Sequence, residues 1–151
     1  LFRSSAVPAV TLTAWKKPLP CNRTNTPTFT LHGYAAMLDD LQVDVANQVA
    51  YRGLIGGSEM VRITDRKPGG SVLMEAVKVA DKNWWTSIQA ATTGAMELVH
   101  GLTAGNIVEL DAPAVQLYSP TYQDQEGILM MAAQMALAPS AGNDEMVLTF
   151  R

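Results

Sequence analysis

Residues 119–151 read SPTYQDQEGILMMAAQMALAPSAGNDEMVLTFR, and they decide the fold that the sequence predicts. Apolar runs of strand length alternate here with short segments rich in Gly, Pro, Asn and Asp, which favour turns. The stretch therefore predicts a strand, a turn, a strand, a second turn and a final strand. The first turn falls on QDQEG, residues 123–127, where two carboxylates, two amides and a glycine occur together.

The QDQEG segment has the residue types of a calcium-binding loop, but it lacks the required spacing. A helix-loop-helix calcium site needs oxygen ligands at alternate positions before its glycine and a glutamate six residues after it. Aligning that glycine with Gly127 places the first ligand at Tyr122 and the last at Ala133, and neither residue supplies a carboxylate. We therefore predict a turn in which Asp124 and Gln125 bond to backbone groups.

The strand predicted over residues 128–137 is apolar on both of its faces, which indicates that both faces are covered. In a domain of this size, either a partner subunit or the helix described below must cover the second face. Methionine is common at subunit interfaces, so Met130 and Met131 are candidate inter-subunit residues.

Upstream, alternation with period two is clearest in LQVDVANQVAYR, residues 41–52. Its apolar positions alternate with Gln42, Asp44 and Gln48. This pattern is typical of a half-buried antiparallel strand with one face in water.

The next segment predicts a hairpin over residues 60–77. Pro68 and Gly69 suit the two central positions of a type II turn, because proline fixes φ at the first and glycine accepts a positive φ at the second. Just before this hairpin, Gly56 and Gly57 predict a break or bulge in the preceding strand.

One helix, over about residues 82–92, interrupts the strands. Asp81 is a suitable N-cap and Gly94 can end the helix. Trp84 and Ile88 at helical spacing predict a face that packs on the sheet rather than a platform for a ligand.

With about eight or nine short strands, the sequence predicts a mainly β protein, an antiparallel β-sandwich or partly closed barrel with one flanking α-helix.

The first 27 residues differ from the rest in composition, because they hold four of the eight prolines. Proline removes a hydrogen-bond donor and fixes φ, so residues 1–27 are predicted to be an extended N-terminal arm with one short strand over 9–14. The arm either reaches a neighbouring molecule or is a frayed terminus. Residues 28–151 form the predicted domain. The chain begins with Leu1, which fits both a trimmed chain and the later part of a longer polypeptide.

Composition indicates one folded domain with a sizeable core. The chain has 151 residues, is 48% hydrophobic and carries a net charge of −3. Its acidic balance and short basic runs argue against nucleic acid as a direct surface partner. A single cysteine, Cys21, excludes an intrachain disulfide, and no segment is long and apolar enough to predict a membrane span.

No catalytic, cofactor or metal motif occurs in the sequence. His32 and His100 are far apart and lack Cys, His or Asp partners at metal-ligand spacing. Phosphate-binding glycine motifs and the G-x-S-x-G nucleophile turn are also absent. We therefore expect no enzyme activity, no cofactor and no metal. A small hydrolase with a triad assembled only in space is a minor hypothesis.

The order of several loose motifs resembles the tail tube proteins of long-tailed bacteriophages. The segments are VAYRGLIGGSEMVRITDRKPGGSVLMEA at 49–76, the single helix, GNIVELDAPAVQLYSPTYQDQEGILMMAAQMAL at 105–137 and GNDEMVLTFR at 142–151. The resemblance covers roughly residues 28–151. It implies a β-sandwich with one flanking helix, and it fits long-tailed phage tubes and the related contractile or secretion-system tubes alike.

The resemblance also implies a function. Such proteins are structural virion components that assemble with themselves into rings, commonly hexameric, and the rings stack into a tail tube through which DNA is ejected. The implied partners are further copies of the chain, a tape-measure protein and other tail proteins. DNA would pass through the lumen without specific binding, and no membrane is involved. The implied location is the phage tail of the virion, assembled in the host cytoplasm.

A tube must also have lumen-facing and inter-subunit surfaces. A bore that does not retain DNA should be neutral or acidic, so the strand 41–52 and the hairpin 60–77 are the candidate lumen-lining sheet. The arm 1–27 and the loop around Ser58 are candidates for contacts between rings. The candidate lumen-facing residues are Gln42, Asp44 and Gln48. The candidate inter-subunit residues are Arg62, Asp65, Arg66, Met130 and Met131.

A second hypothesis belongs to a different functional class. The chain could be a monomeric β-sandwich binding module that holds a carbohydrate or peptide through Trp84, Trp85 and Tyr122. A tube protein should form rings or hollow rods, whereas a binding module should stay small.

Overall fold

The computed structural model describes residues 16–151, so the strand expected over residues 9–14 lies outside the described part of the chain. The described residues form antiparallel strands and one short helix. In chain order these are β1 (Thr28–Leu31), β2 (Leu38–Asp44), β3 (Asn47–Leu54), β4 (Ser58–Arg66), β5 (Gly69–Glu75), α1 (Trp84–Gln89), β6 (Thr93–His100), β7 (Val108–Gln125), β8 (Ile128–Leu137) and β9 (Val147–Phe150).

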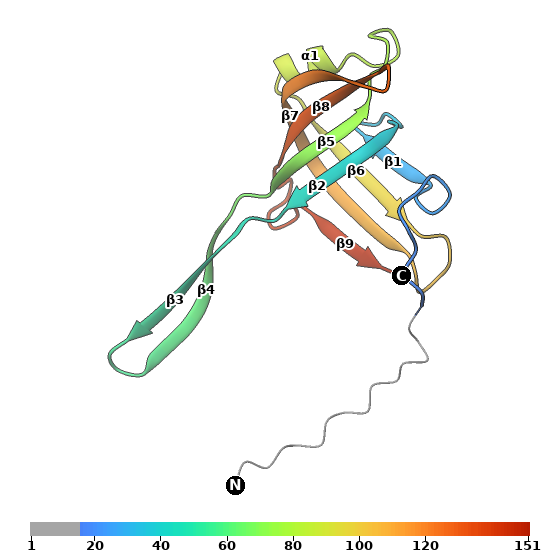
Figure 1. Cartoon of the computed structure of the whole chain (residues 1–151). Helices are drawn as coiled ribbons and strands as arrows, with labels where there is room; N and C mark the ends of the chain where they lie inside the picture. Colours follow the sequence, from blue (N-terminus) through green and yellow to red (C-terminus); the bar gives the residue numbers. More distant parts are fainter. Residues whose placement is uncertain (1–15) are drawn as a thin grey trace.

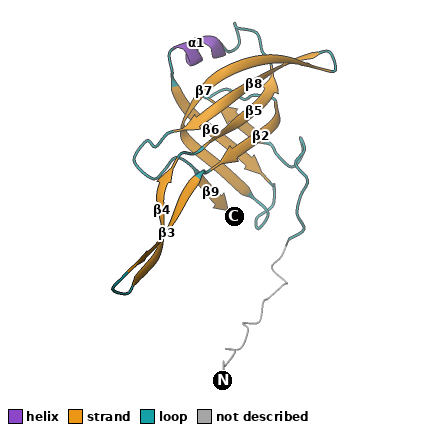
Figure 2. Cartoon of the chain, turned by 60° about the vertical axis from the view of Figure 1, so that its left-hand side comes forward, coloured by secondary structure: helices purple, strands orange, loops and turns teal. Residues whose placement is uncertain are grey.

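Seven strands form a single curled sheet. The order is β1-β6-β7-β8-β5-β2, β9 pairs with the first part of β7, and every pairing is antiparallel. The sheet curves into a half-barrel with α1 at one end, as Figures 1 and 2 show. The predicted mainly β class is confirmed, and of its two architectures the protein adopts the partly closed barrel.

The concave face of this sheet holds the core. Alternate residues of each strand point inward, so strands with period two supply a continuous apolar interior. On β8, Met131 and Met135 are buried whereas Gln134 between them is exposed. The buried core residues are Phe29, Leu31, Ala36, Val72, Met74, Trp84, Met96, Ala112, Val115, Leu117, Met131, Ala133, Met135 and Leu137.

The longest strand, β7, contains two prolines and changes register beside each of them. Pro113 lies where pairing with β6 shifts, and Pro120 lies where pairing with β8 shifts. A proline cannot donate a ladder hydrogen bond, so a strand tolerates it best at such irregularities. β7 therefore continues through both prolines as one element of 18 residues.

The first turn of the 119–151 stretch has the predicted position. Gln125 pairs with Ile128 across two residues, Glu126 and Gly127, which both have positive φ (55° and 84°). This is the geometry of a tight two-residue hairpin turn. The Asp124 carboxylate accepts a hydrogen bond from the Gly127 N–H at 3.2 Å, as predicted, whereas no such bond from Gln125 is present among the described residues.

The helix is shorter than predicted and has a different cap. Asn83, not Asp81, is the N-cap, and its side-chain oxygen accepts a hydrogen bond from the Thr86 N–H at 3.1 Å. Ala91, not Gly94, has the left-handed φ (49°) after the helix, while Gly94 already belongs to β6. Among the described residues, no helix is long and apolar enough to cross a membrane.

Residues 38–75 form one long ribbon with a break in it. β2 pairs with β5 inside the sheet, and β3 pairs with β4 as a separate hairpin that projects from the body. The predicted hairpin over 60–77 is therefore wrong, because β4 and β5 pair with other strands and Gly69 does not have a positive φ. The turn of the hairpin that does form, between β3 and β4, contains Gly56 and Gly57, with φ of 112° and 90°.

The strand predicted over 41–52 is also divided. It breaks between Asp44 and Asn47, where Ala46 has a φ of 48° and its N–H donates to the Asp44 carboxylate at 2.8 Å. This break separates the strand that belongs to the sheet from the strand that belongs to the projecting hairpin.

The β2–β5 pairing that holds this hairpin depends on Gly70. A Cβ added at Gly70 would lie 1.9 Å from the backbone oxygen of Gln42, which only a backbone shift can relieve. We predict that Gly70→Ala lowers the free energy of unfolding by about 3 kcal/mol, as overpacking does. Urea unfolding measures this difference.

Gly53→Ala is the matched control, because its added Cβ would meet only the movable Tyr51 side chain. It should change stability far less. Equal stability of the Gly70→Ala variant and the unchanged protein would contradict the close β2–β5 approach.

Candidate assembly surface on the β3–β4 hairpin

The β3–β4 hairpin stands apart from the body of the protein. Every residue of β3 is exposed, and the hairpin points away from the half-barrel in each view (Figures 1 and 2). A two-stranded hairpin without further support is only marginally stable in water. Its exposed length makes the hairpin a candidate interaction surface.

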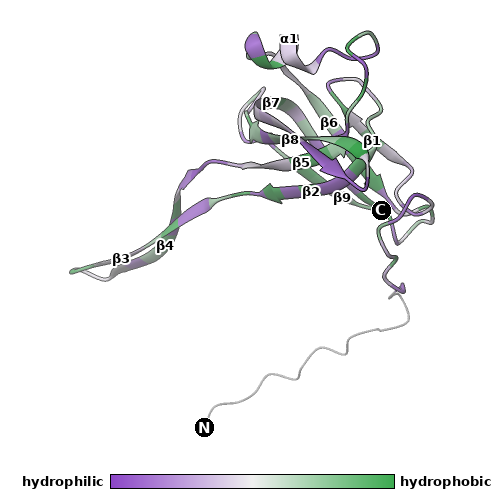
Figure 3. Ribbon diagram, turned by 45° about the horizontal axis from the view of Figure 1, so that its top comes forward, coloured by the Kyte–Doolittle hydropathy of each residue, from purple (hydrophilic) through white to green (hydrophobic). Residues whose placement is uncertain are grey.

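One face of this hairpin is apolar. Val49 pairs with Ile63, and Tyr51 pairs with Val61, so the four side chains share a face. Each is 62–66% exposed, and apolar residues recur along the projecting strands in Figure 3. Ile55 extends the apolar surface to the turn. Contiguous exposed apolar side chains of this kind mark interaction sites.

The Tyr51 hydroxyl donates a hydrogen bond to the Glu59 carboxylate near the turn. This bond raises the pKa of Tyr51 above its usual value, because it favours the protonated hydroxyl, and partial desolvation acts in the same direction. The apolar face therefore ends in a polar contact that holds the tyrosine ring in place.

The opposite face of the hairpin carries two arginines. Ala50 pairs with Arg62, and Arg52 pairs with Met60, so these four residues share the second face. The Arg62 Nε lies 2.7 Å from the Met60 sulfur. Among the described residues, neither Arg52 nor Arg62 forms an ion pair, so both charges are available to another molecule.

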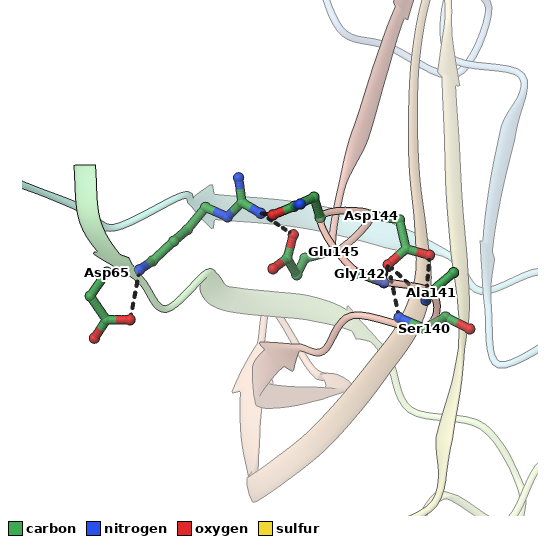
Figure 4. Close-up of polar contacts among 8 residues, drawn as sticks. Asp65, Ser140, Ala141, Gly142, Asp144 and Glu145 are labelled. Atoms are coloured by element: carbon green, nitrogen blue, oxygen red, sulfur yellow. Dashed lines mark hydrogen bonds and ion pairs between the residues drawn. The ribbon is translucent and has the colours of Figure 1, made fainter. Parts of the chain in front are cut away.

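The base of the hairpin is fixed by an ion pair. The Arg66 guanidinium at the end of β4 donates to the Glu145 carboxylate at 2.6 Å and to the Asn143 side-chain oxygen at 3.3 Å. Both partners lie in the loop between β8 and β9. In that loop the Asp144 carboxylate accepts hydrogen bonds from the N–H groups of 140–142, as Figure 4 shows.

These contacts shift the pKa values of two carboxyl groups. The pKa of Glu145 is lowered, first by its own backbone N–H and then by the Arg66 hydrogen bond, since both favour the charged form. Burial acts to raise the pKa of Asp144, but the three loop N–H groups lower it below its usual value. The loop that orients the hairpin is thus held together by charged carboxylates.

The predicted lumen-facing residues do not lie on one element. Gln42 and Asp44 are exposed on the convex face of β2, opposite the inward-facing Leu41 and Val43, as the alternation predicted. Gln48 lies beyond the break, on the projecting hairpin.

The predicted inter-subunit residues are also divided. Arg62, Asp65 and Arg66 all lie on β4, where Arg66 bonds within its own chain and the Asp65 carboxylate lies 3.6 Å from the Lys67 ammonium. Met130 and Met131 are 7% and 2% exposed in the single chain; Met131 belongs to the core cluster, whereas Met130 lies on the other face of β8, outside that cluster. The exposed apolar face of the hairpin was not among the predicted residues, although the alternation over 41–52 already placed Val49 and Tyr51 on one side.

Two further polar groups lie away from the hairpin. His32 Nε2 bonds to the Val115 oxygen at 2.8 Å, and burial lowers the pKa of this histidine. Glu97, Glu109 and Asp111 bring carboxylate oxygens within 4.8 Å of one another on β6 and β7. These oxygens are of a type that binds cations, but Glu109 already pairs with Arg151 at 2.9 Å. The sequence did not indicate this cluster, because only strand pairing assembles it.

The aromatic residues of the alternative hypothesis have different environments. Trp84 is buried in the core, with Tyr34 and His32 edge-on at 6.0 and 6.2 Å. Trp85 and Tyr122 are partly exposed and already bond to each other, since the Trp85 Nε1–H donates to the Tyr122 oxygen at 3.0 Å.

Comparisons with known proteins find a match in structure but none in sequence. No protein-family model matches the chain, and no curated protein matches it in sequence. Among solved structures, the anti-feeding prophage cap, a tube-terminating cap solved by cryo-EM, is similar in fold, with a TM-score of 0.62 and 12% sequence identity. The match covers 94% of this chain and 100% of the cap chain. The two proteins therefore share a fold.

The Arg66–Glu145 ion pair should make the stability of the protein depend on pH. Because the pKa of Glu145 is lowered in the folded state, the pair stabilises the protein above the usual glutamate pKa and is lost as the pH falls through the lowered value. In Arg66→Gln, we expect the Glu145 carboxyl to titrate at higher pH in a ¹³C NMR experiment. The stability difference from the unchanged protein should be greatest above about pH 5 and shrink in acid.

Arg62→Gln is the control, because Arg62 does not contact the β8–β9 loop in the described structure. It should leave the Glu145 titration in place. An unchanged Glu145 midpoint in Arg66→Gln would show that the ion pair does not hold the hairpin base.

Proposed function

We propose that this chain is a structural subunit of a phage-tail-like tube and that it acts by assembling with copies of itself. The observation that supports this most strongly is the exposed apolar face of the β3–β4 hairpin, made by Val49, Tyr51, Val61 and Ile63. Complete burial of each such side chain contributes about 1.5–3 kcal/mol. The fold likeness to a tube-terminating cap fits the same role.

The open sheet offers a way to join copies. β1 and β2 end the sheet on its two sides, and β3 and β4 each have one pairing partner among the described strands. Unpaired strand edges accept a strand from another molecule. If neighbours continue the sheet by head-to-tail contacts whose rotation closes, the copies form a ring.

The finer features of the role come from the resemblance seen in the sequence. In our proposal the rings stack into a tube, hexameric rings being the common form, and DNA passes through its lumen during ejection. The protein has no catalytic activity, assembles in the host cytoplasm, becomes part of the virion and contacts a tape-measure protein and other tail proteins. Gln42 and Asp44 would supply neutral and acidic groups to the bore, which would limit DNA binding.

A tube-terminating ring is a second candidate function, because the similar solved structure is a tube cap. Both roles require a ring, but a terminating ring would not stack on itself. Negative-stain microscopy separates them, since stacked rods support a tube subunit and single rings support a cap.

A carbohydrate- or peptide-binding module is the third candidate. The exposed Trp85–Tyr122 pair is the one aromatic contact that favours it. This candidate predicts a monomer whose tryptophan fluorescence changes with a ligand, so rings formed by the pure protein would argue against it.

The hairpin proposal predicts the effect of a double variant. Val61→Ser with Ile63→Ser removes half of the apolar face at exposed positions, so the fold should remain and assembly should fail. Circular dichroism checks the fold, and sedimentation velocity with negative-stain microscopy checks assembly.

Leu102→Ser is the control, since Leu102 is equally exposed but lies in the β6–β7 loop. It should assemble as the unchanged protein does. Normal assembly of the Val61/Ile63 double variant would show that the apolar face of the hairpin is not needed for assembly.

The lumen assignment predicts a separate result. In assembled particles, Asp44→Lys removes the hydrogen bond to the Ala46 N–H but should leave the β-sheet intact, and it should increase retention of DNA because it adds positive charge where the bore is proposed to lie. The Asp44→Asn variant shows the effect of removing the negative charge alone, without adding a positive one. DNA retention equal in all three proteins would place Asp44 outside the bore.

A further inference from the structure

The hairpin leaves the half-barrel at one end of three adjacent strands, and a different surface lies at their other end. Asp44 of β2 pairs with Gly69 of β5 at the hairpin end. Leu38 pairs with Met74 at the far end, where Met74 also pairs with Met131 of β8. The β7–β8 tip and α1 lie at this far end, away from the hairpin (Figure 2).

We call this far end the acidic end, because acidic residues outnumber basic ones there. It carries two lysines, and the Lys82 ammonium already donates to the His32 oxygen at 2.8 Å. None of its acidic residues forms an ion pair among the described residues. The exposed acidic residues of this end are Asp39, Asp40, Glu75, Asp81, Asp124 and Glu126, and its lysines are Lys78 and Lys82.

The acidic end is also apolar. Large hydrophobic side chains lie exposed beside the carboxylates, and two of them follow the turn that holds Asp124 and Glu126. These exposed residues are Met37, Val79, Trp85, Tyr122, Ile128 and Leu129. The end therefore combines apolar area with unpaired negative charge.

The hairpin combines an apolar face with two unpaired arginines on its other face, while the Glu59 carboxylate near its turn accepts a hydrogen bond from Tyr51. Its first face carries Val49, Tyr51, Val61 and Ile63, and its second face carries Arg52 and Arg62. The two surfaces are thus complementary in both properties, and they lie at opposite ends of the same strands. A copy that uses both surfaces can contact one copy at each end, which is the condition for an open stack.

We propose that the β3–β4 hairpin of one copy docks on the acidic end of the next copy. This inference rests on the proposed function and adds to it the receiving surface and the polarity of the stack. The apolar residues supply affinity, while Arg52 and Arg62 facing Asp124 and Glu126 fix the direction of docking and exclude hairpin-to-hairpin contact.

Charge reversal with reciprocal rescue tests the docking in the full chain. The first variant carries Arg52→Glu and Arg62→Glu, and the second carries Asp124→Lys and Glu126→Lys. Each variant alone brings like charges together at every junction. We expect each to need at least about a tenfold higher concentration for assembly than the unchanged protein, by sedimentation velocity and negative-stain microscopy.

An equimolar mixture of the two variants makes every junction complementary again if copies alternate. We expect the mixture to assemble near the concentration that the unchanged protein requires, which no folding defect in either variant could produce. Circular dichroism confirms that each variant is folded.

The outcomes separate this inference from the proposed function. If the unchanged protein stays monomeric, the proposed function fails and the docking fails with it. If the unchanged protein assembles and both variants assemble equally well, or the mixture does not recover, the docking is wrong while the tube subunit stands.

Discussion

The structure depends on the close antiparallel pairing of β2 with β5. At Gly70 the two backbones approach so closely that a single added carbon would meet the Gln42 oxygen at 1.9 Å. This pairing adds β2 as the last strand of the half-barrel, and residues 45–68 leave the sheet from it. The Arg66–Glu145 ion pair then ties the end of the hairpin to the β8–β9 loop. The place where the hairpin leaves the body is therefore set by one strand pair and one ion pair.

The surface chemistry of the projection is the main support for the proposed assembly. Four large side chains lie exposed on a two-stranded ribbon instead of being buried within the chain, and exposed apolar faces of this kind mark interaction sites. They are Val49, Tyr51, Val61 and Ile63. Water penalises this arrangement until another surface covers it. The charges add direction, since the unpaired arginines of the hairpin and the unpaired carboxylates near Glu126 lie at opposite ends of the same strands. In the proposed assembly, association through these surfaces joins unlike ends.

Local patterns in the sequence predicted the strands but not all of their partners. Alternation identified the inward Leu41 and Val43 and the outward Gln42 and Asp44, and the Asp124–Gly127 turn followed from local chemistry. Pro68-Gly69 suggested a turn wrongly, because the partners of β4 and β5 are set by contacts far apart in the chain, which spacing does not encode. For the same reason the sequence did not indicate the carboxylate cluster on β6 and β7.

Hydrogen–deuterium exchange of the hairpin amides at low and high protein concentration tests the central claim most directly. Exchange across residues 47–66 should be fast in dilute protein, because an isolated two-stranded hairpin is only marginally stable, and slow at concentrations where particles form. Exchange in the core strands should change much less. Hairpin exchange that stays fast in assembled particles would contradict the account, because it would show that the hairpin remains in water when the copies meet.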